Sequence, residues 1–335
     1  MTAATRRAAG TMQGSRREVT RARGIRRFRR MVLTPMGLLI FFILTPAFLL
    51  QLYFSLNQFS IFAAGDNPGF LSYFNASEWV GFELYEAVFT DDKFGAAIIR
   101  SLLFSVGATL GCFVFGFGLA LLMYRPFRGQ AVYYLFFILP MLTVPIVIAY
   151  TGEMILYQNG PLNDILSRLI GTRVNVQFLY KQEIALTTIM FMEIWNWTPF
   201  SFIIMMAGLA SLPKEPQEAA QILGASKLRI FWEVQLPLLR PVILLALILR
   251  FLESIAEFPK TYGLLQGGPG SATETLPVYI FLNTWQYFDI SYGAALSYVT
   301  LLLMMTIVYG AIWLLRREKR NLDAIYTRRA AEGAS

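Results

Sequence analysis

The apolar positions of the chain fall into six long runs separated by polar segments. A helix needs roughly 20 mostly apolar residues to cross a hydrocarbon layer about 30 Å thick. Six stretches reach that length, and the polar segments between them leave no room for a separate domain. The pattern predicts an all-α polytopic membrane protein with about six transmembrane helices. They cover approximately residues 32–56, 97–124, 132–156, 184–210, 241–262 and 291–315.

Composition supports a membrane protein and excludes most catalytic chemistry. The 335 residues are 56% hydrophobic and 15% charged, with a mean hydropathy of +0.52. The sequence has no histidine, and its single cysteine, Cys112, lies inside an apolar run. Histidine-based acid–base catalysis, zinc motifs built on histidine, disulfides and CxxC pairs are therefore ruled out. We expect no catalytic residues, no metal site and no enzymatic activity in this chain.

The distribution of basic residues predicts how the helices cross the membrane. Ten arginines lie in the first thirty residues. The two tails and the segments 125–131 and 211–240 together hold 22 Lys and Arg, against four in the segments assigned to the opposite side. Basic residues favour the cytoplasmic side, so we expect both termini there. The net charge of +8 follows this flanking pattern and does not indicate nucleic-acid binding.

The chain is expected to form one membrane domain between two tails. Residues 1–31 form a basic cytoplasmic tail, residues 32–316 the membrane domain, and residues 317–335 the C-terminal cytoplasmic tail. The first apolar run is longer than the core of a cleaved signal peptide, which indicates an uncleaved first span.

One polar stretch interrupts the apolar pattern on the cytoplasmic side. Prolines bracket the segment 211–240, and Gly224 near its middle permits a turn. We expect a helix, a bend, and a second short helix from about Ser226 until Pro237 stops it. Pro241 can then open the next span.

Each short helix of this segment carries an apolar face at the i, i+3, i+4 spacing. Such a face could dock on a protein or lie on lipid. An interfacial helix would have a strongly basic polar face, whereas acids and bases are nearly balanced here, which favours docking. The apolar residues are Ala219, Ile222 and Leu223 in the first helix, and Leu228, Phe231 and Trp232 in the second.

The same segment resembles the coupling motif of the membrane subunits of bacterial ABC importers. EAA is followed after three residues by Gly, and after nine more by a β-branched residue, one residue and LP. The matching positions are Glu218, Ala219, Ala220, Gly224, Val234, Leu236 and Pro237. The resemblance implies an ATPase-coupling site comprising these residues with Ala225 and Ser226. Many relatives have Asp directly before the glycine, where this chain has Leu223, so a polar contact of that Asp is not carried over.

The resemblance extends from about residue 32 to 316, and residues 264–297 are similar to the last outer loop of carbohydrate-type permeases of the maltose and glycerol-phosphate class. It implies a bacterial plasma-membrane location and transport by alternating access. The implied partners are a second homologous permease, an ATPase dimer and an extracytoplasmic solute-binding protein. No cofactor is expected in this chain, because no glycine is followed by lysine as a GxxxxGK phosphate loop requires. ATP and magnesium would bind to the partner ATPase.

Charged residues within the fifth run form a second candidate site. Arg250, Glu253, Glu257 and Lys260 are spaced three, four and three apart, which predicts one helical face. Each mid-membrane charge costs roughly 2.5–3.5 kcal/mol, so these groups should face protein or water and pair with one another. They could line a substrate pathway or form an ion-paired stripe that only packs against neighbouring helices.

The fourth run contains polar and aromatic residues at mid-depth in the sequence MEIWNWTPF. Pro199 removes a backbone hydrogen bond, so this part of the helix should be buried or line a cavity. Trp195 and Trp197 could stack on a sugar ring, and Glu193 and Asn196 could bind hydroxyl groups. An ordinary kinked helix with packing aromatics explains the same residues.

Two other functional classes compete with an ATP-driven importer. A secondary transporter would show broken spans in both halves of the chain and no docking segment. A membrane enzyme would require a convergent catalytic pair, which the sequence does not supply. The sequence leaves the substrate open among oligosaccharides, monosaccharides, polyols and glycerol phosphate.

Overall fold

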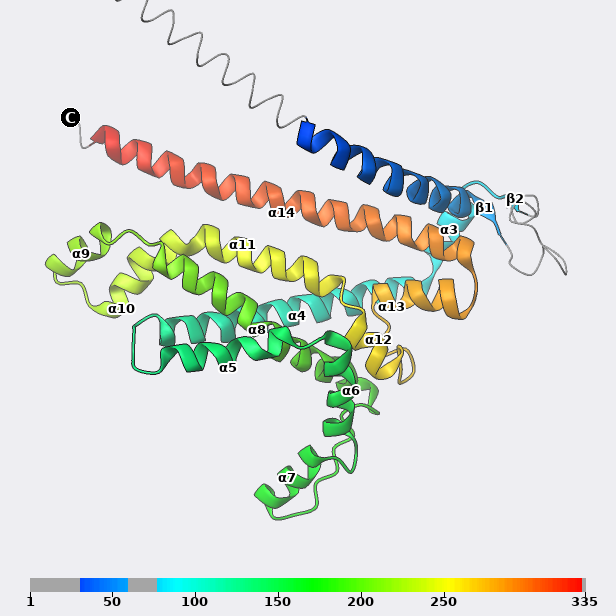
Figure 1. Cartoon of the computed structure of the whole chain (residues 1–335), viewed down its shortest axis with the longest axis horizontal. Coiled ribbons are helices and arrows are strands. Elements are labelled where there is room, and N and C mark those ends of the chain that lie inside the picture. The colour runs from blue at the N-terminus through cyan, green and yellow to red at the C-terminus, as the bar shows by residue number, and fades with distance from the viewer. Residues whose placement is uncertain (1–30, 60–76, 333–335) are drawn as a thin grey trace, which may run out of the picture.

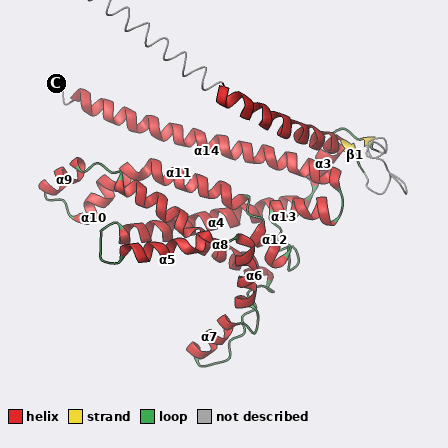
Figure 2. Cartoon of the chain, viewed as in Figure 1, coloured by secondary structure: helices red, strands yellow, loops and turns green. Residues whose placement is uncertain are grey.

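The computed structural model describes residues 31–59 and 77–332, with side-chain surroundings up to Arg317. The chain folds into long, roughly aligned helices joined by short ones (Figures 1 and 2). Residues 1–30 of the basic tail, and residues 60–76 between the first two expected spans, lie outside the described residues.

Four of the six expected spans are single helices within the described part of the chain. Each is long and apolar enough to cross a membrane, which confirms the corresponding sequence predictions. They are the helix Met31–Leu56, α4 (Asp92–Met123), α8 (Gln182–Ala210) and the part Ile290–Arg317 of the longer α14 (Ile290–Glu332).

The third expected span is broken into two helices. Helix α5 (Gln130–Leu142) and helix α6 (Pro145–Leu156) meet at an angle of 95°. Pro145 opens α6, and a residue before proline avoids the helical conformation. Thr143 and Val144 accordingly have extended backbones, so the prediction of one continuous helix over 132–156 was wrong.

The fifth expected span also differs from its predicted bounds. Helix α11 runs from Leu236 to Ile255, and after a short break α12 covers Pro259–Leu265. Helix α11 carries three charged side chains, those of Arg240, Arg250 and Glu253, and is not among the four spans above.

The predicted helix stop at Pro237 was also wrong. A π-helical turn, Phe231–Gln235, connects α10 (Lys227–Ile230) directly to α11. The amide of Leu236 donates to the carbonyl of Phe231, five residues back. This wider turn makes room for the proline ring, which would otherwise clash with the preceding turn of an α-helix. Pro241 likewise lies inside α11 and does not open it.

Short elements complete the fold at the two ends of the bundle. A small antiparallel sheet pairs Asn57 with Trp79. In Figure 1, α9 lies at one end of the bundle, whereas α6, α7, α12 and α13 lie toward the other. The short elements are β1 (Asn57–Gln58), β2 (Glu78–Trp79), α3 (Glu83–Thr90), α7 (Pro161–Ile170), α9 (Glu215–Ile222), α13 (Leu276–Phe281) and the π-helix η3 (Leu282–Gln286).

The core of the bundle is the contact between α4 and α8, which a glycine makes possible. A Cβ atom added to Gly116 would lie 2.6 Å from the Cβ of Ser201 and 2.8 Å from the backbone nitrogen of Phe202. The helix backbones can therefore approach closely only because this side chain is absent. Buried Ala120, Phe202 and Met205 fill the neighbouring layer.

We expect Gly116→Val to lower the stability of the folded protein by about 1–3 kcal/mol, because the added side chain must push α4 away from α8. A Cβ at Gly118 on the same helix meets no atom within 4 Å, so Gly118→Val is the matched control. Thermal unfolding of both variants in detergent provides the measurement. Equal unfolding temperatures would contradict the close-approach argument.

At the end of the bundle opposite α9, one carboxylate joins three helices. Asp91 precedes α4 and accepts hydrogen bonds from the hydroxyl groups of Tyr279 in α13 and Tyr292 in α14. Burial alone would raise the pKa of Asp91, but the hydrogen bonds from the two tyrosines and from the backbone amides of Lys93 and Phe94 together hold this pKa below its usual value. Burial, with the hydrogen bond to Asp91, raises the pKa of Tyr279 to about 12.

This contact should make stability depend on acid pH. Because the pKa of Asp91 is lower in the folded state, its contribution is complete above the usual value of 3.8 and is lost as the pH falls through the lower folded value. The unfolding temperature should therefore fall in this range more steeply for the parent than for Asp91→Asn. Curves of unfolding temperature against pH that run parallel for the two proteins would contradict the proposed role of the carboxylate.

Candidate functional site

The polar segment between α8 and α11 has the expected helix–bend–helix form. Helix α9 ends at a left-handed glycine, Gly224, with φ of +78°. The backbone amide of Gly224 donates to the carbonyl of Gln221 at 2.9 Å, and the backbone amide of Ala225 donates to the carbonyl of Ala220 at 3.0 Å. These two bonds form a Schellman cap, which ends the helix and fixes the direction of the next one.

Side-chain contacts stabilise the second short helix and join it to the first. The hydroxyl oxygen of Ser226 accepts a hydrogen bond from the amide of Arg229 at 3.3 Å and so caps α10. Arg229 in turn donates to both carboxylate oxygens of Glu233 at 3.0 Å. The side-chain nitrogen of Gln235 donates a hydrogen bond to the side-chain oxygen of Gln217 at 2.9 Å, which joins the second helical stretch to α9. The segment is therefore a defined unit with its own internal contacts.

The surface of this unit carries large apolar side chains that no other part of the described chain covers. Ile222 and Leu223 are 86% and 87% exposed, and Leu228 and Trp232 are 68% and 59% exposed. Phe231 differs from the prediction, because it packs on Phe117 of α4 with ring centroids 6.2 Å apart. One aromatic residue thus anchors the segment to the bundle, while its neighbour stays on the surface.

The positions of the coupling motif divide between surface and bundle. The side chains of Glu218, Ala219 and Ser226 are exposed, and Gly224 forms the bend. The half-buried members are Ala220, Ala225, Val234, Leu236 and Pro237. The motif therefore combines residues that face outward with residues that attach the unit to the helices.

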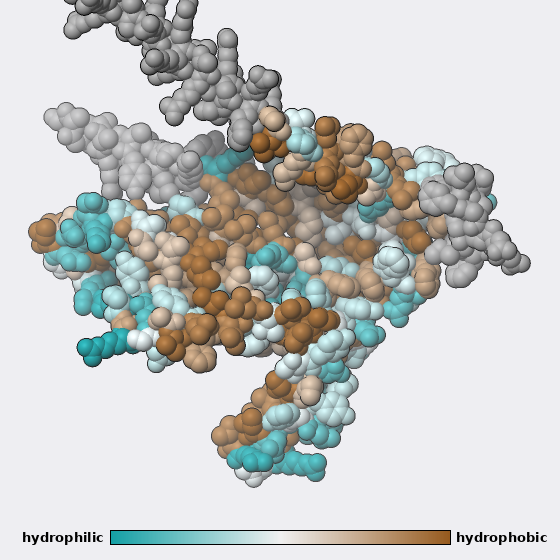
Figure 3. Space-filling model, viewed as in Figure 1, coloured by the Kyte–Doolittle hydropathy of each residue, from teal (hydrophilic) through white to brown (hydrophobic). Residues whose placement is uncertain are grey.

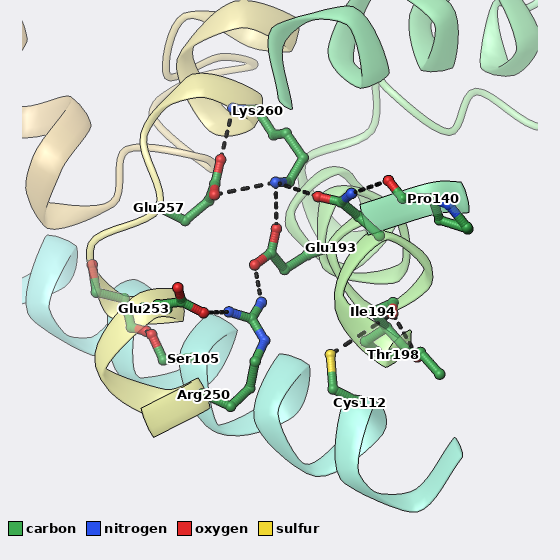
Figure 4. A network of polar contacts seen from close by, with 12 residues as sticks. Ser105, Cys112, Pro140, Glu193, Ile194, Thr198, Arg250, Glu253, Glu257 and Lys260 are labelled. Atoms are coloured by element: carbon green, nitrogen blue, oxygen red, sulfur yellow. Dashed lines mark hydrogen bonds and ion pairs between the residues drawn. The ribbon is translucent and has the colours of Figure 1, made fainter. Parts of the chain in front are cut away.

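A second site lies inside the bundle, where Glu193 of α8 sits between two basic side chains (Figure 4). One carboxylate oxygen contacts the guanidinium group of Arg250, and the other lies 2.7 Å from the ammonium nitrogen of Lys260. Glu193 and Lys260 are 0% exposed and Arg250 is 1% exposed. Charges this deeply buried are tolerated only when they are paired.

Two further acids complete the arrangement. Glu257 is 9% exposed and lies 3.2 Å from Lys260. The side chain of Glu253 is 47% exposed and lies 3.6 Å from Arg250. The four buried groups therefore comprise two acids and two bases, and Glu253 lies at the edge of the cluster.

Two neutral side chains of α8, those of Asn196 and Trp197, also contact the charge cluster. The oxygen of the Asn196 side chain accepts a hydrogen bond from Lys260 at 3.2 Å, and its nitrogen donates to the carbonyl of Pro140 at 2.7 Å. The guanidinium carbon of Arg250 lies 5.0 Å from the centroid of the Trp197 ring, which is a cation–π distance. The cluster thus connects α8 and α11 to the end of α5 and to α12.

The structure changes the predicted geometry of these residues. The four charges do not share one face of one helix, because α11 ends at Ile255 and Lys260 belongs to α12. They also pair mainly through Glu193 of α8, which sequence spacing within the fifth run could not show. The helix break between α11 and α12 turns Lys260 back toward α8.

Trp195 is separated from the other predicted pathway residues. Its side chain is 55% exposed and lines an apolar hollow of about 410 Å³ together with Pro140 and Pro199, away from the charge cluster. Residues two apart on a helix point to nearly opposite sides, so Trp195 and Trp197 could not share one face. Pro140 was not among the predicted residues, because its contribution is a backbone carbonyl.

Comparison with known proteins identifies the family. Residues 112–320 match the family described as "Binding-protein-dependent transport system inner membrane component". The chain belongs to this family. The match contains the helix–bend–helix unit, Glu193 and the charged residues of α11 and α12, and it confirms the importer family that the coupling motif predicted.

Sequence similarity to other permeases extends over most of this chain. It is 34% identical to the sulfoquinovosyl glycerol transport system permease protein SmoG of Agrobacterium fabrum, over 69% of this chain and 75% of that protein. It is 32% identical to the trehalose/maltose transport system permease protein MalF of Thermococcus litoralis, over 72% and 81%. A crystal structure of a bacterial ABC transporter that imports alginate contains a chain with the same fold, at a TM-score of 0.70, 22% identity and coverage of 87% and 95%.

Removing the central acid of the cluster should destabilise the permease. We expect Glu193→Gln to lower the free energy of unfolding by about 3–5 kcal/mol, because two buried cations would then share one buried carboxylate. Glu253→Gln is the control, and its effect should stay below about 1 kcal/mol because Glu253 is half-exposed. Thermal unfolding of the purified permease provides the measurement. Equal losses in the two variants would contradict the central position of Glu193.

Proposed function

We propose that this permease forms one half of an ATP-driven import pathway for a sugar or a related polyol. A second, homologous permease would supply the other half. A separate ATPase dimer would bind ATP and magnesium, and an extracytoplasmic solute-binding protein would deliver the substrate. The resemblance to permeases named for glycosides supports the substrate class.

The helix–bend–helix unit is the observation that carries this proposal. Its internal contacts give it a defined shape, and its outward side presents Ile222, Leu223, Leu228 and Trp232. Exposed apolar patches of this kind mark protein-interaction sites. A groove on the ATPase that accepts these side chains would bury them and grip the unit. The exposed carboxylate of Glu218 would lie at the rim of that contact.

The orientation of the permease follows from its basic residues and from the position of this unit. The α9–α10 end of the bundle also contains the C-terminal part of α14 (Figure 1). The segments 125–131 and 211–240 are rich in basic residues relative to the opposite loops, which supports a cytoplasmic location for this end under the positive-inside rule. Both termini would then be cytoplasmic, and the ATPase could reach the unit.

Transport would proceed by alternating access, with conformational energy supplied from outside this chain. ATP-dependent closure of the ATPase dimer would displace the α9–α10 unit. Because α8 and α11 directly flank the unit, that displacement would reach the interior of the membrane along both helices. A pathway between two permeases would open to one side and then to the other.

The residues around the charge cluster are the proposed contribution of this chain to the substrate pathway. Trp197 offers an aromatic ring, and the half-exposed Glu253 offers a hydrogen-bond acceptor at the edge of the cluster. Glu193, Asn196, Arg250 and Glu257 hold this edge in place from the interior. Trp195 borders a separate apolar hollow and would contact substrate only if that hollow belongs to the pathway.

The coupling role can be tested in the assembled transporter in liposomes. Glu218→Ala and Gly224→Val should reduce ATPase activity stimulated by the loaded binding protein at least about tenfold, corresponding to about 1.4 kcal/mol of lost coupling. Valine is strained at φ of +78°, so it would change the direction of α10. Co-purification of the ATPase reports the docking separately from the activity.

A matched control separates coupling from simple backbone strain. Gly171 ends α7 with a similar φ of +76°, far from the α9–α10 unit in Figure 1. Gly171→Val should introduce comparable strain and leave stimulated ATPase activity near that of the parent. If both motif variants keep full assembly and stimulation, the coupling assignment fails. Uptake that persists without the ATPase would instead support a secondary transporter.

A further inference from the structure

The helix α7 belongs to a hairpin that leaves the bundle sideways. Helix α6 turns by 95° from α5, and α7 follows it before residues 171–181 return to α8. Figure 1 shows α7 projecting away from the aligned helices, on the side of the bundle where α5 lies. Under the proposed orientation, a segment that follows a cytoplasmic-to-outside helix lies toward the outer side of the membrane.

The hairpin has a fixed internal structure. Asn163 is 3% exposed, and its side-chain nitrogen donates to the carbonyls of Gln158 and Val176 at 3.0 and 2.9 Å. Its side-chain oxygen accepts from the amide of Val176 at 3.1 Å. Ser167, one turn further on, accepts from the amide of Val174 at 2.9 Å. These bonds attach one side of α7 to the returning chain and so fix which side faces outward.

The sides of α7 that remain have opposite character. Asp164 and Arg168 form an exposed ion pair at 2.9 Å on one side. On the apolar side of the helix, Ile165, Leu169 and Ile170 are 53%, 77% and 62% exposed. Figure 3 shows this hairpin brown on one flank, turned in that view toward the α9 end of the molecule, and teal on its far side. Under the proposed orientation, the α9 end is cytoplasmic, so this apolar flank would face in the direction of the membrane interior.

The residues around α7 are typical of a segment that lies at a lipid–water boundary. Tyr157 and Tyr180 stand at the base of the hairpin, each about half exposed, with ring centroids 6.4 Å apart. Tyrosine is enriched at membrane interfaces. Arg168 and Arg173 line a polar hollow of about 470 Å³ within the hairpin. Basic groups beside an aliphatic stripe match the phosphates and acyl chains of phospholipids.

We propose that α7 is an interfacial helix, whose stripe of Ile165, Leu169 and Ile170 lies in the outer leaflet of the bilayer. A protein-binding surface would be expected to centre on aromatic or arginine anchors, whereas this stripe is purely aliphatic. This contact would support the broken third span. Helix α6 packs against α12, and α7, which follows α6, would be held by lipid. This inference rests on the orientation given under the proposed function.

The test uses nitroxide spin labels on the assembled transporter in vesicles of phosphatidylcholine and phosphatidylglycerol. In a Cys112→Ala background, one label replaces Leu169 and a matched control replaces Asp164 on the opposite side of the same helix. Oxygen concentrates in lipid, and a nickel chelate stays in water. We expect the Leu169→Cys label to collide more with oxygen than with the chelate, and the Asp164→Cys label to show the reverse. A second pair guards against a local effect of one label: Ile165→Cys on the apolar side, and Thr172→Cys at a residue that lines the polar hollow.

Two outcomes would overturn the inference. A Leu169→Cys label that collides with the chelate as readily as the control would show a solvated helix. A label shielded from both reagents would show that a second permease or the binding protein covers the stripe. The measurement requires neither ATP nor substrate, so loss of coupled transport and loss of lipid contact can be told apart. Adding the chelate from outside alone tests the orientation itself.

Discussion

The arrangement of the bundle depends on pairing charges that cannot be left alone in an apolar medium. Each isolated charge at mid-membrane costs roughly 2.5–3.5 kcal/mol. Glu193 contacts Arg250 and Lys260 at once, and Glu257 balances the second base. Since these groups come from α8, α11, α12 and the break between the last two, pairing fixes how those elements lie relative to one another. Packing at Gly116 then brings α4 against the same helix.

The cluster also holds two places where helices are interrupted. Lys260 follows the break between α11 and α12, and through Asn196 it is linked to the carbonyl of Pro140 near the break between α5 and α6. Breaks leave backbone groups without helical partners, which lipid cannot satisfy. Placing both breaks beside buried polar side chains is one way to keep such a structure stable inside a membrane.

Local patterns in the sequence predicted more of the fold than of the site. The apolar runs predicted the ends of four spans to within about five residues, and Gly224 predicted the bend, because both depend on short-range chemistry. The break at Pro145 was missed, because a proline in an apolar run is compatible with a kink, a break or a helix start. The predicted helix stop at Pro237 was wrong because a π-helical turn accommodated the proline ring.

For the site, the separation of Trp195 from Trp197 could have been predicted from helical geometry, because residues two apart point to nearly opposite sides of a helix. The pairing of Glu193 with Arg250 and Lys260 could not be predicted in this way, because it joins residues far apart in sequence.

The position of the α9–α10 unit explains how a displacement at the membrane surface could act at depth. Near the unit, α8 and α11 touch at Gly208, where an added Cβ would lie 2.9 Å from a methyl group of Val242. Deeper in the membrane the same two helices are joined by Glu193 and Arg250. Sliding one helix along the other would separate that ion pair, so the two should move as one body. The ion pair between Glu193 and Lys260 extends this body across the break beyond Ile255 to α12. In the proposed mechanism, a push on the unit would therefore move α8, α11 and α12 together and carry the charge cluster with them.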